Sequence, residues 1–204
     1  MRTSLAGPRM LILVRHGQSQ ANEAGLLAGR IDSALTNKGV SQAQALVPEL
    51  TQARYVITSP LQRARDTAAH AMPHLEALVD DAFIEMNYGD VDGRPLAEVG
   101  RSTWEALQKD HDWQIPGGES MADVDQRVHA GLDTLVSEHR ELISSLDEHL
   151  VIVSHVSPIK SALAWALGVP GTIAWRTRLD NATMTGIGLT GSRLTLHFYN
   201  RPAR

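Results

Sequence analysis

The sequence alternates short apolar runs with longer segments in which apolar residues recur at helical spacing. The runs at 10–15, 55–59 and 150–154 are almost continuously apolar, as expected of strands buried on both faces. Two alternating segments, 183–190 and 193–200, predict a closing antiparallel hairpin. The predicted helices begin near residues 40, 59, 96, 121 and 157. This order predicts an α/β fold, a three-layer α/β/α sandwich with a mainly parallel central sheet.

Capping residues set the expected ends of several elements. Ser59 is predicted to cap a helix that Pro60 opens, and Ser120 to cap a long helix over 121–144. Residues 80–85 are predicted to form a strand that runs into a loop rich in turn residues.

Length and composition narrow the class of protein. A chain of 204 residues predicts a single domain, and its irregular stretch 88–118 predicts an insertion that caps a site. Trp104 and Trp113 in that stretch are candidate substrate contacts. The net charge of −4 gives no basic footprint for nucleic acid or for an anionic membrane. There is no cysteine, which excludes disulfides, thiolate metal sites and a cysteine nucleophile.

The sequence gives no sign of membrane insertion or secretion. The apolar runs are too short to cross a bilayer, and residues 1–10 lack the apolar region of a signal peptide. We therefore expect a cytoplasmic protein.

Two of the nine histidines share a context that the others lack. His16 follows the strand 10–15, and His155 follows the strand 150–154. Ligands of open α/β sheets bind at the carboxyl ends of the strands, so both imidazoles are expected at one edge. Arg15 and Arg63 are expected beside them. The helix starts near 59 and 157 are expected to add backbone N–H groups that favour an anion.

This set of groups suits a phosphoryl group. Arginine offers a planar fork of donors to phosphate oxygens, and a neutral imidazole such as that of His16 can attack phosphorus. A protonated His155 would stabilise charge on the phosphoryl oxygens. Glu85 is the preferred proton donor for the leaving group, whereas Asp90 and Asp92 look more like turn residues.

Other interpretations of the same residues stay open at this point. Arg15 and His16 also fit an ordinary polar strand end. A metal-dependent hydrolase would use His16, Glu85, Asp90 and His155 as ligands, although two arginines would repel the cation. A binding module for phosphorylated ligands, without turnover, is a third interpretation.

Five segments, in order, resemble signatures of the histidine phosphatase superfamily, which includes the cofactor-dependent phosphoglycerate mutases. They are "LVRHGQSQAN", "TSPLQRARDTA", "IEMNYGDVDG", "PGGES" and "VIVSH". The resemblance covers nearly the whole chain from Leu11 and implies a phosphoglycerate mutase-like fold. It also implies that His16 becomes phosphohistidine and that Glu85 donates and later accepts a proton. It implies no metal and no cofactor.

The resemblance assigns the remaining site residues. The implied phosphate pocket consists of Arg15, Arg63 and His155, and the further contacts to the substrate are Gln18, Ser19, Asn22, Ala28, Gly29, Tyr88 and Val156.

The sequence departs from the family pattern at three places, of which the first concerns the shape of the pocket wall and the other two favour a phosphatase over a mutase. Val156 stands where the family usually has glycine. Met86 and Asn87 occupy the stretch where the mutases hold the substrate carboxylate with an arginine. The segment 88–118 has few basic residues, namely Arg94, Arg101 and Lys109.

The resulting prediction is a metal-independent phosphatase that hydrolyses small phosphomonoesters, such as sugar or glycerate phosphates, through phosphohistidine. The alternative is a cofactor-dependent phosphoglycerate mutase. The expected partner is a small phosphorylated metabolite. Neither nucleic acid nor membrane is expected, and a homodimer is the assembly that we consider.

Overall fold

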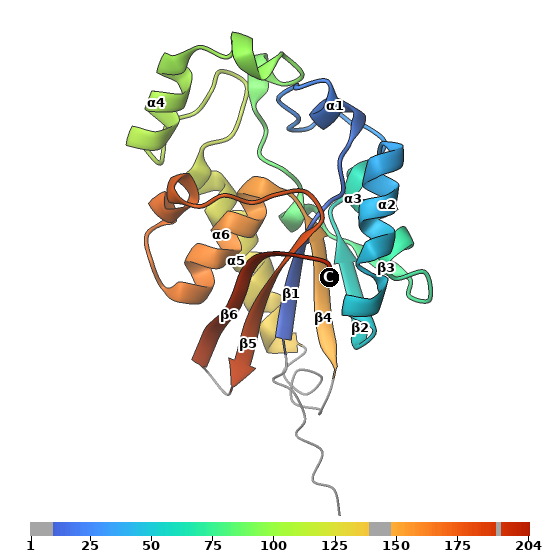
Figure 1. Ribbon diagram of the computed structural model, residues 1–204. Helices are drawn as coiled ribbons and strands as arrows, with labels where there is room; N and C mark the ends of the chain where they lie inside the picture. Colours follow the sequence, from blue (N-terminus) through green and yellow to red (C-terminus); the bar gives the residue numbers. More distant parts are fainter. Residues whose placement is uncertain (1–9, 139–147, 191–192) are drawn as a thin grey trace, which may run out of the picture.

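A single six-stranded sheet forms the centre of the molecule (Figure 1). The computed structural model describes residues 10–138, 148–190 and 193–204. The sheet order is β3-β2-β4-β1-β5-β6. The strands are β1 Met10–Arg15, β2 Ala53–Thr58, β3 Ala77–Val79, β4 His149–Ser154, β5 Thr183–Thr190 and β6 Arg193–Pro202. The strands β3, β2, β4 and β1 are parallel, and β5 and β6 are antiparallel. The mainly parallel sheet and the closing hairpin are confirmed.

Helices lie between most of these strands along the chain. The α-helices are α1 Gln20–Glu23, α2 Asn37–Ala45, α3 Gln62–Ala71, α4 Arg101–Lys109, α5 Met121–Glu138 and α6 Val156–Leu167. The 3₁₀ helices are η1 Val47–Leu50, η2 Asp81–Phe83, η3 Gly89–Val91, η4 Leu96–Glu98 and η5 Gly171–Arg176.

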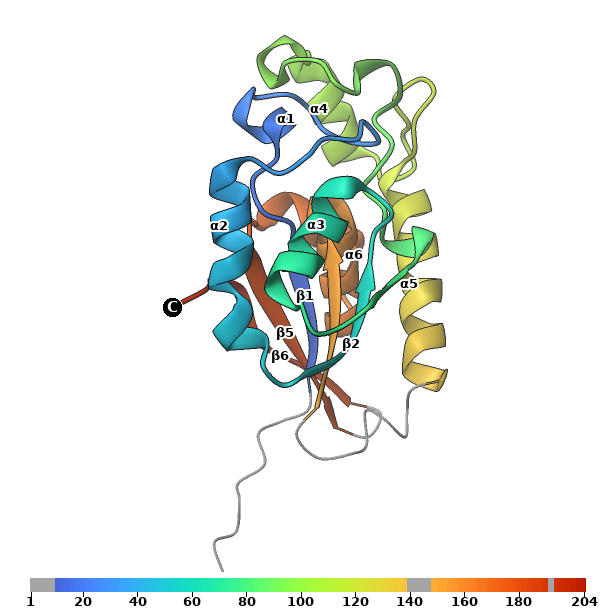
Figure 2. The same ribbon diagram turned by 90° about the vertical axis from the view of Figure 1, so that its right-hand side faces the viewer.

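The central strand β1 explains the three layers. Its side chains alternate between two hydrophobic cores, because successive residues of a strand point to opposite faces. Leu11 and Leu13 pack in the core that contains residues of α5 and α6. Ile12 and Val14 pack in the core that contains residues of α3 and Leu46, the C-cap residue of α2. Figure 2 shows these two helix pairs on either side of the sheet. The continuous apolar run therefore reflects burial on both faces.

The long helix α5 begins as the sequence predicts. The Ser120 hydroxyl accepts a hydrogen bond from the Asp123 N–H at 3.1 Å, and the Asp123 carboxylate accepts one from the Ser120 N–H at 2.9 Å. This reciprocal pair satisfies N–H groups that the first helical turn leaves free. The helix is described as far as Glu138, and the rest of the expected range to residue 144 lies outside the described residues.

The prediction that Ser59 caps the next helix is wrong. Helix α3 begins at Gln62, and its N-cap residue is Leu61, which makes no side-chain hydrogen bond there. The Gln62 N–H is instead satisfied by the Asp32 carboxylate at 2.7 Å. The Ser59 hydroxyl accepts from the Leu61 N–H at 3.3 Å, ahead of the helix, and it also lies 2.7 Å from Nε2 of His155.

The strand predicted at 80–85 is also absent. The strand in this region is β3, which ends at Val79, and a 3₁₀ turn, η2, follows it. Side chains satisfy the backbone here instead of a neighbouring strand: Ser154 donates to the Phe83 carbonyl at 2.6 Å, and Arg127 donates to the Ala82 carbonyl at 2.8 Å. The single helix expected from residue 96 to 108 is divided into η4 and α4, with Gly100 at the N-cap of α4.

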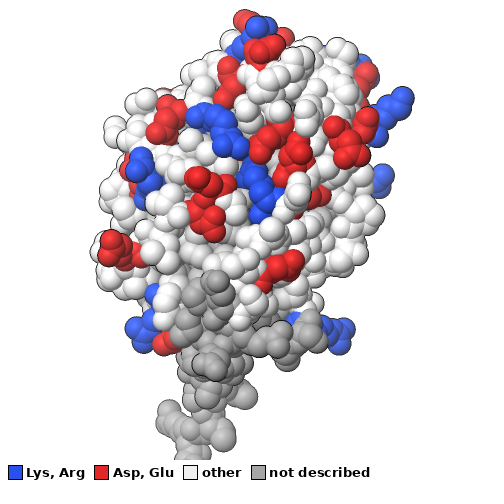
Figure 3. All heavy atoms as spheres, turned by 180° about the vertical axis from the view of Figure 1, so that it is seen from behind, with Lys and Arg blue, Asp and Glu red and all other residues white. Residues whose placement is uncertain are grey.

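The segment 88–118 lies beyond the end of the sheet where β1 and β4 end, with α4 at the top of Figure 1. On the face shown in Figure 3, acidic and basic side chains are interspersed, with no broad patch of one sign. Among the described helices, none is both long and apolar enough to span a bilayer.

Candidate functional site

Register in the sheet brings the two predicted histidines together. Arg15 of β1 is paired with Ser154 of β4, so His16 and His155 leave the sheet side by side. The His16 N–H donates to the Ser154 carbonyl at 3.0 Å, which holds the two strand ends together. The imidazole centroids lie 5.0 Å apart. Parallel pairing alone therefore places both rings at one edge, as the sequence predicts.

The environment of His16 leaves it neutral, with one nitrogen free. Its Nδ1 lies 2.7 Å from the Gly17 carbonyl oxygen. A carbonyl only accepts, so Nδ1 carries the proton and Nε2 keeps its lone pair. Burial, with the positive charges of Arg63 and Arg15, holds the pKa of His16 well below its usual value. A neutral imidazole with a free Nε2 is a competent nucleophile.

His155 is fully buried beside His16. Its Nε2 contacts the Ser59 hydroxyl at 2.7 Å, and its Nδ1 has no partner among the described residues. Burial, and then the neighbouring His16 and Arg63, hold the pKa of His155 well below its usual value. An incoming anion would reverse this electrostatic balance and favour the protonated ring.

The two arginines have different surroundings. Arg15 donates through Nη1 to the Leu179 carbonyl at 2.6 Å, and its Nε has no partner in the part of the chain that is described. Arg63 has no exposed surface and donates to three carbonyls of the segment 28–31. Burial lowers the pKa of both guanidinium groups, although carboxylates including Glu85 oppose this effect. Both remain cationic because arginine starts from such a high pKa.

The Asp92 carboxylate holds the same segment from the other side. It accepts hydrogen bonds from the N–H groups of Gly29 and Arg30, each at 2.7 Å, and of Ile31 at 3.1 Å. Gly29 fits because a Cβ atom there would lie 2.6 Å from the Met86 carbonyl oxygen. The prediction that Asp92 is only a turn residue therefore misses its role in fixing this segment.

Glu85 is buried against the start of α6. Its Oε1 accepts from the N–H groups of Met86 at 2.8 Å and Ser157 at 3.1 Å, and its Oε2 accepts from Val156 at 3.0 Å. The sequence predicted that this helix start would bind the phosphate. In the structure these first N–H groups donate to the oxygens of the Glu85 side chain, which already occupies that position.

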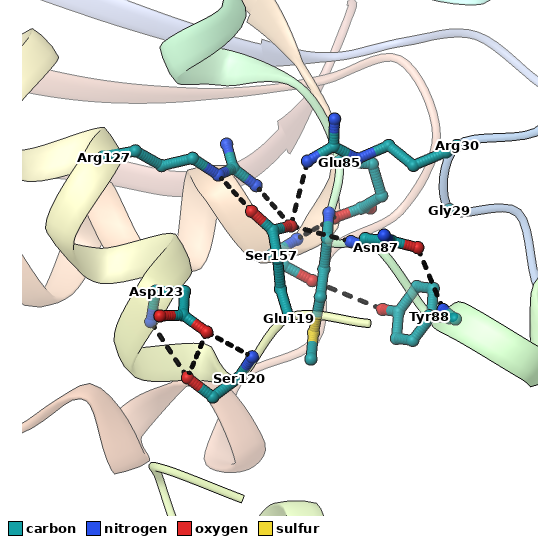
Figure 4. A network of polar contacts seen from close by, with 12 residues as sticks. Gly29, Arg30, Glu85, Asn87, Tyr88, Glu119, Ser120, Asp123, Arg127 and Ser157 are labelled. Carbon is teal, nitrogen blue, oxygen red and sulfur yellow. Dashed lines mark hydrogen bonds and ion pairs between the residues drawn. The ribbon is translucent and has the colours of Figure 1, made fainter. Parts of the chain in front are cut away.

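A polar network supports the chain on either side of the site (Figure 4). The Glu119 carboxylate accepts from the Asn87 N–H at 2.8 Å, from Arg30 at 3.0 Å and from Arg127 at 3.0 Å. Burial raises the pKa of Glu119, but the bonds from Asn87 and Arg127 outweigh it and leave this pKa below its usual value. Glu119 thus joins the segment 28–31, the chain after Glu85, and α5.

A cavity of about 260 Å³ opens over these groups. Seven of the predicted residues line it: Arg15, His16, Asn22, Ala28, Glu85, Tyr88 and Val156. Arg63 and His155 do not line it and lie next to His16 as buried neighbours. The cavity therefore exposes His16 together with Arg15 and the carboxyl group of Glu85.

Three predicted contacts lie away from the cavity wall. The N–H of Gln18 donates to Gln42 at 2.9 Å, and that of Ser19 donates to Asn22 at 3.2 Å. The N–H of Gly29 is bound by Asp92. The hydrogen bond from the Ser19 N–H to Asn22 has a local cause, because these two residues form a capping box at α1. Asn22 both belongs to this cap and lines the cavity.

Sequence reasoning missed several groups around the site. Lys160 and Trp175 line the cavity and were not predicted. Of the two tryptophans that the sequence named as candidate contacts, Trp104 lines the cavity, and Trp113 packs against the core without lining it. Lys160 was detectable in principle, since it lies four residues after Val156 and thus on the same helical face. Asn181 donates to the His16 carbonyl at 3.2 Å and gave no local signal. Within the described ranges, no three His, Asp or Glu side chains are grouped to hold a metal ion.

Comparison with known proteins identifies the family of this chain. The profile of the histidine phosphatase superfamily (branch 1) matches residues 11–202. The chain is 29% identical to the putative phosphoserine phosphatase 2 of Hydrogenobacter thermophilus, over 95% of this chain and 96% of that protein. It is 31% identical to phosphoserine phosphatase 1 of the same organism, over 90% and 88%.

A solved structure shows the same fold. It is a mycobacterial glucosyl-3-phosphoglycerate phosphatase in complex with VO3, which is 29% identical and superposes with a TM-score of 0.86. The match covers 95% of this chain and 99% of that one. The expected phosphoglycerate mutase-like sandwich is therefore confirmed.

Proposed function

Because the chain belongs to branch 1 of the histidine phosphatase superfamily, we propose that it hydrolyses small phosphomonoesters through a phosphohistidine at His16 and without a metal. The observation that carries the proposal is the state of His16: buried, neutral, with Nε2 free at a cavity that Arg15 and Glu85 share. The phosphatases named above, which act on phosphoserine and glucosyl-3-phosphoglycerate, support this reaction class.

In the first step, Nε2 of His16 attacks phosphorus in line, and the bond from phosphorus to the ester oxygen breaks. Arg15 and Arg63 balance the charge of the phosphoryl oxygens. His155 donates to the phosphoryl group in this proposal, and its Nδ1, which has no partner among the described residues, supports that role once an anion favours protonation of the ring. Glu85 transfers a proton to the leaving alkoxide; its Oε2 accepts a single N–H and can carry that proton.

In the second step, the Glu85 carboxylate takes a proton from water, and the water oxygen attacks the phosphohistidine. The nitrogen–phosphorus bond breaks, inorganic phosphate leaves, and both His16 and Glu85 return to their starting states. The phosphate that leaves therefore contains one oxygen from water.

We further propose that the segment 88–118 acts as the cap that selects the substrate, since Tyr88, Leu96 and Trp104 line the cavity over His16. A cytoplasmic location, a homodimer and the absence of a nucleic-acid partner stay predictions of the sequence.

The direct test is rapid quench with a ³²P-labelled phosphomonoester in the presence of a chelator. We expect a protein-bound label that is stable to base and labile to acid. The label should be absent from His16→Ala and present in His74→Ala, which changes an exposed histidine. Turnover without any trapped label, or turnover abolished by the chelator, would refute the proposed mechanism. Isomerisation of phosphoglycerate with a bisphosphate primer, without net phosphate release, would favour the mutase.

A further inference from the structure

Lys160 places an ammonium group in the wall of the cavity that contains His16. It lies on α6, four residues after Val156, so the helix presents both residues on one face. Its Nζ donates to the Ala174 carbonyl at 2.7 Å. An ammonium has three donors, and this is the one hydrogen bond found for it within the described part of the chain.

No fixed anion pairs with this cation. Among the described residues, no carboxylate lies within ion-pair distance of Lys160. Burial lowers its pKa, with the charge of Glu85 opposing and that of Arg15 adding to this shift. The charges of Glu85 and Arg15 therefore act on the Lys160 ammonium, although neither side chain forms a hydrogen bond or ion pair with it.

The cavity that Lys160 lines has a largely apolar wall. Leu26, Leu96, Trp104, Met121 and Trp175 belong to this wall, beside polar residues that include Arg15 and Glu85. A charge placed among apolar walls is costly unless it is paired, and Lys160 is half-buried there with one carbonyl as partner. A ligand that brings an anion would remove this cost.

We propose that Lys160 is a specificity-determining residue that binds a carboxylate of the substrate while the phosphoryl group lies at His16. This assignment rests on the proposed phosphatase function and adds the substrate class: a small phosphomonoester that carries a carboxylate close to the ester. A carboxylate matches a single ammonium in charge. A second phosphate would bring further negative charge that the apolar walls leave unbalanced.

The test compares ligands that differ by the carboxylate alone. Inhibition constants against hydrolysis of p-nitrophenyl phosphate are measured for 3-phosphoglycerate and glycerol 3-phosphate, and for phosphoserine and phosphoethanolamine. The enzymes are the wild type, Lys160→Met, which keeps an apolar side chain of similar length, and Lys160→Arg, which keeps the charge. Lys38→Met is the matched control, because Lys38 is exposed on α2.

In the wild type we expect tighter binding of the carboxylated member of each pair. In Lys160→Met this preference falls by on the order of tenfold or more, since a charge-assisted hydrogen bond is lost. Lys160→Arg retains most of the preference, and Lys38→Met retains all of it.

The outcomes separate this proposal from the underlying function. Equal weakening of both members of each pair in Lys160→Met would assign Lys160 a structural role, tying α6 to η5, and would overturn the proposal. The proposal would also be overturned if the wild type showed no preference for the carboxylated member of either pair. A third such outcome is a second phosphate that tightens binding more than a carboxylate does, as judged by the inhibition constants of fructose 1,6-bisphosphate and fructose 6-phosphate. Failure of the wild type to hydrolyse any of the phosphomonoesters would instead refute the phosphatase function itself.

Discussion

Asp92 and Arg63 hold one short segment of chain from opposite sides. Asp92 accepts from the N–H groups of residues 29–31, and Arg63 donates to the carbonyls of Ala28, Gly29 and Ile31. The backbone polar groups of this segment are thereby satisfied without regular secondary structure. Ala28 at the cavity owes its position to the two side chains.

Asp92→Ala is expected to lower both stability and activity, because three buried or half-buried N–H groups lose their acceptor. The expected loss is about 1–3 kcal/mol in the free energy of unfolding. Urea denaturation measures it, and kcat/KM for a phosphomonoester is measured alongside. Asp90→Ala is the matched control, since Asp90 is exposed and lies two residues away. Equal effects of the two substitutions would show that Asp92 does not fix this segment.

Glu85→Gln is expected to slow hydrolysis most for substrates whose leaving group is a strong base. An alkoxide needs the proton that Glu85 supplies, whereas p-nitrophenolate leaves without one. We expect a loss of about 10²–10⁴-fold in kcat/KM on alkyl phosphates and a clearly smaller loss on p-nitrophenyl phosphate. The same loss on both classes would argue that Glu85 organises the start of α6 rather than transferring a proton.

Stability is expected to fall as the pH drops below about 6.5, the usual pKa of histidine. Burial holds the pKa of His16 and of His155 well below that value in the folded protein. The unfolded chain therefore binds more protons, so the free energy of unfolding decreases with falling pH. Each histidine contributes a slope of about 1.4 kcal/mol per pH unit in that window.

This slope is measured by urea denaturation at several pH values between about 7.5 and 5. His155→Gln should lose one histidine's share of the slope. Near pH 7.5, above the range in which these histidines gain protons, the free energy of unfolding of the same variant gives the effect of the substitution itself. An unchanged slope would show that His155 gains its proton equally in both states.

Glu119→Ala is expected to destabilise the protein by about 1–3 kcal/mol, because the Asn87 N–H and two guanidinium groups lose a charged acceptor. Thermal or urea unfolding measures this loss. Glu105→Ala removes the exposed ion pair with Arg101 and should change stability by less than about 1 kcal/mol. A loss no greater than that of Glu105→Ala would contradict the view that this network supports the site.

Periodicity and chain order predicted most of the scaffold. The run 11–14 is apolar throughout because this part of β1 is buried on both faces, and β4 repeats the pattern. Both strands are parallel neighbours, so the residues that follow them meet at one edge. The sequence therefore predicts that His16 and His155 lie together. These features depend on local spacing and on general rules of sheet topology.

The contacts that complete the site were decided by the tertiary structure. Ser59 has the sequence context of a helix cap, but it lies before the N-cap residue Leu61 and contacts His155 as well. Asp92 resembles a turn residue and binds a segment about sixty positions earlier. The start of α6 resembles a phosphate site and binds Glu85. Lys160 lies in no motif and reaches the cavity because α6 packs there. Each of these polar groups contacts a complementary group that is close in space but far away in the sequence. Local spacing along the chain does not predict which distant groups come together.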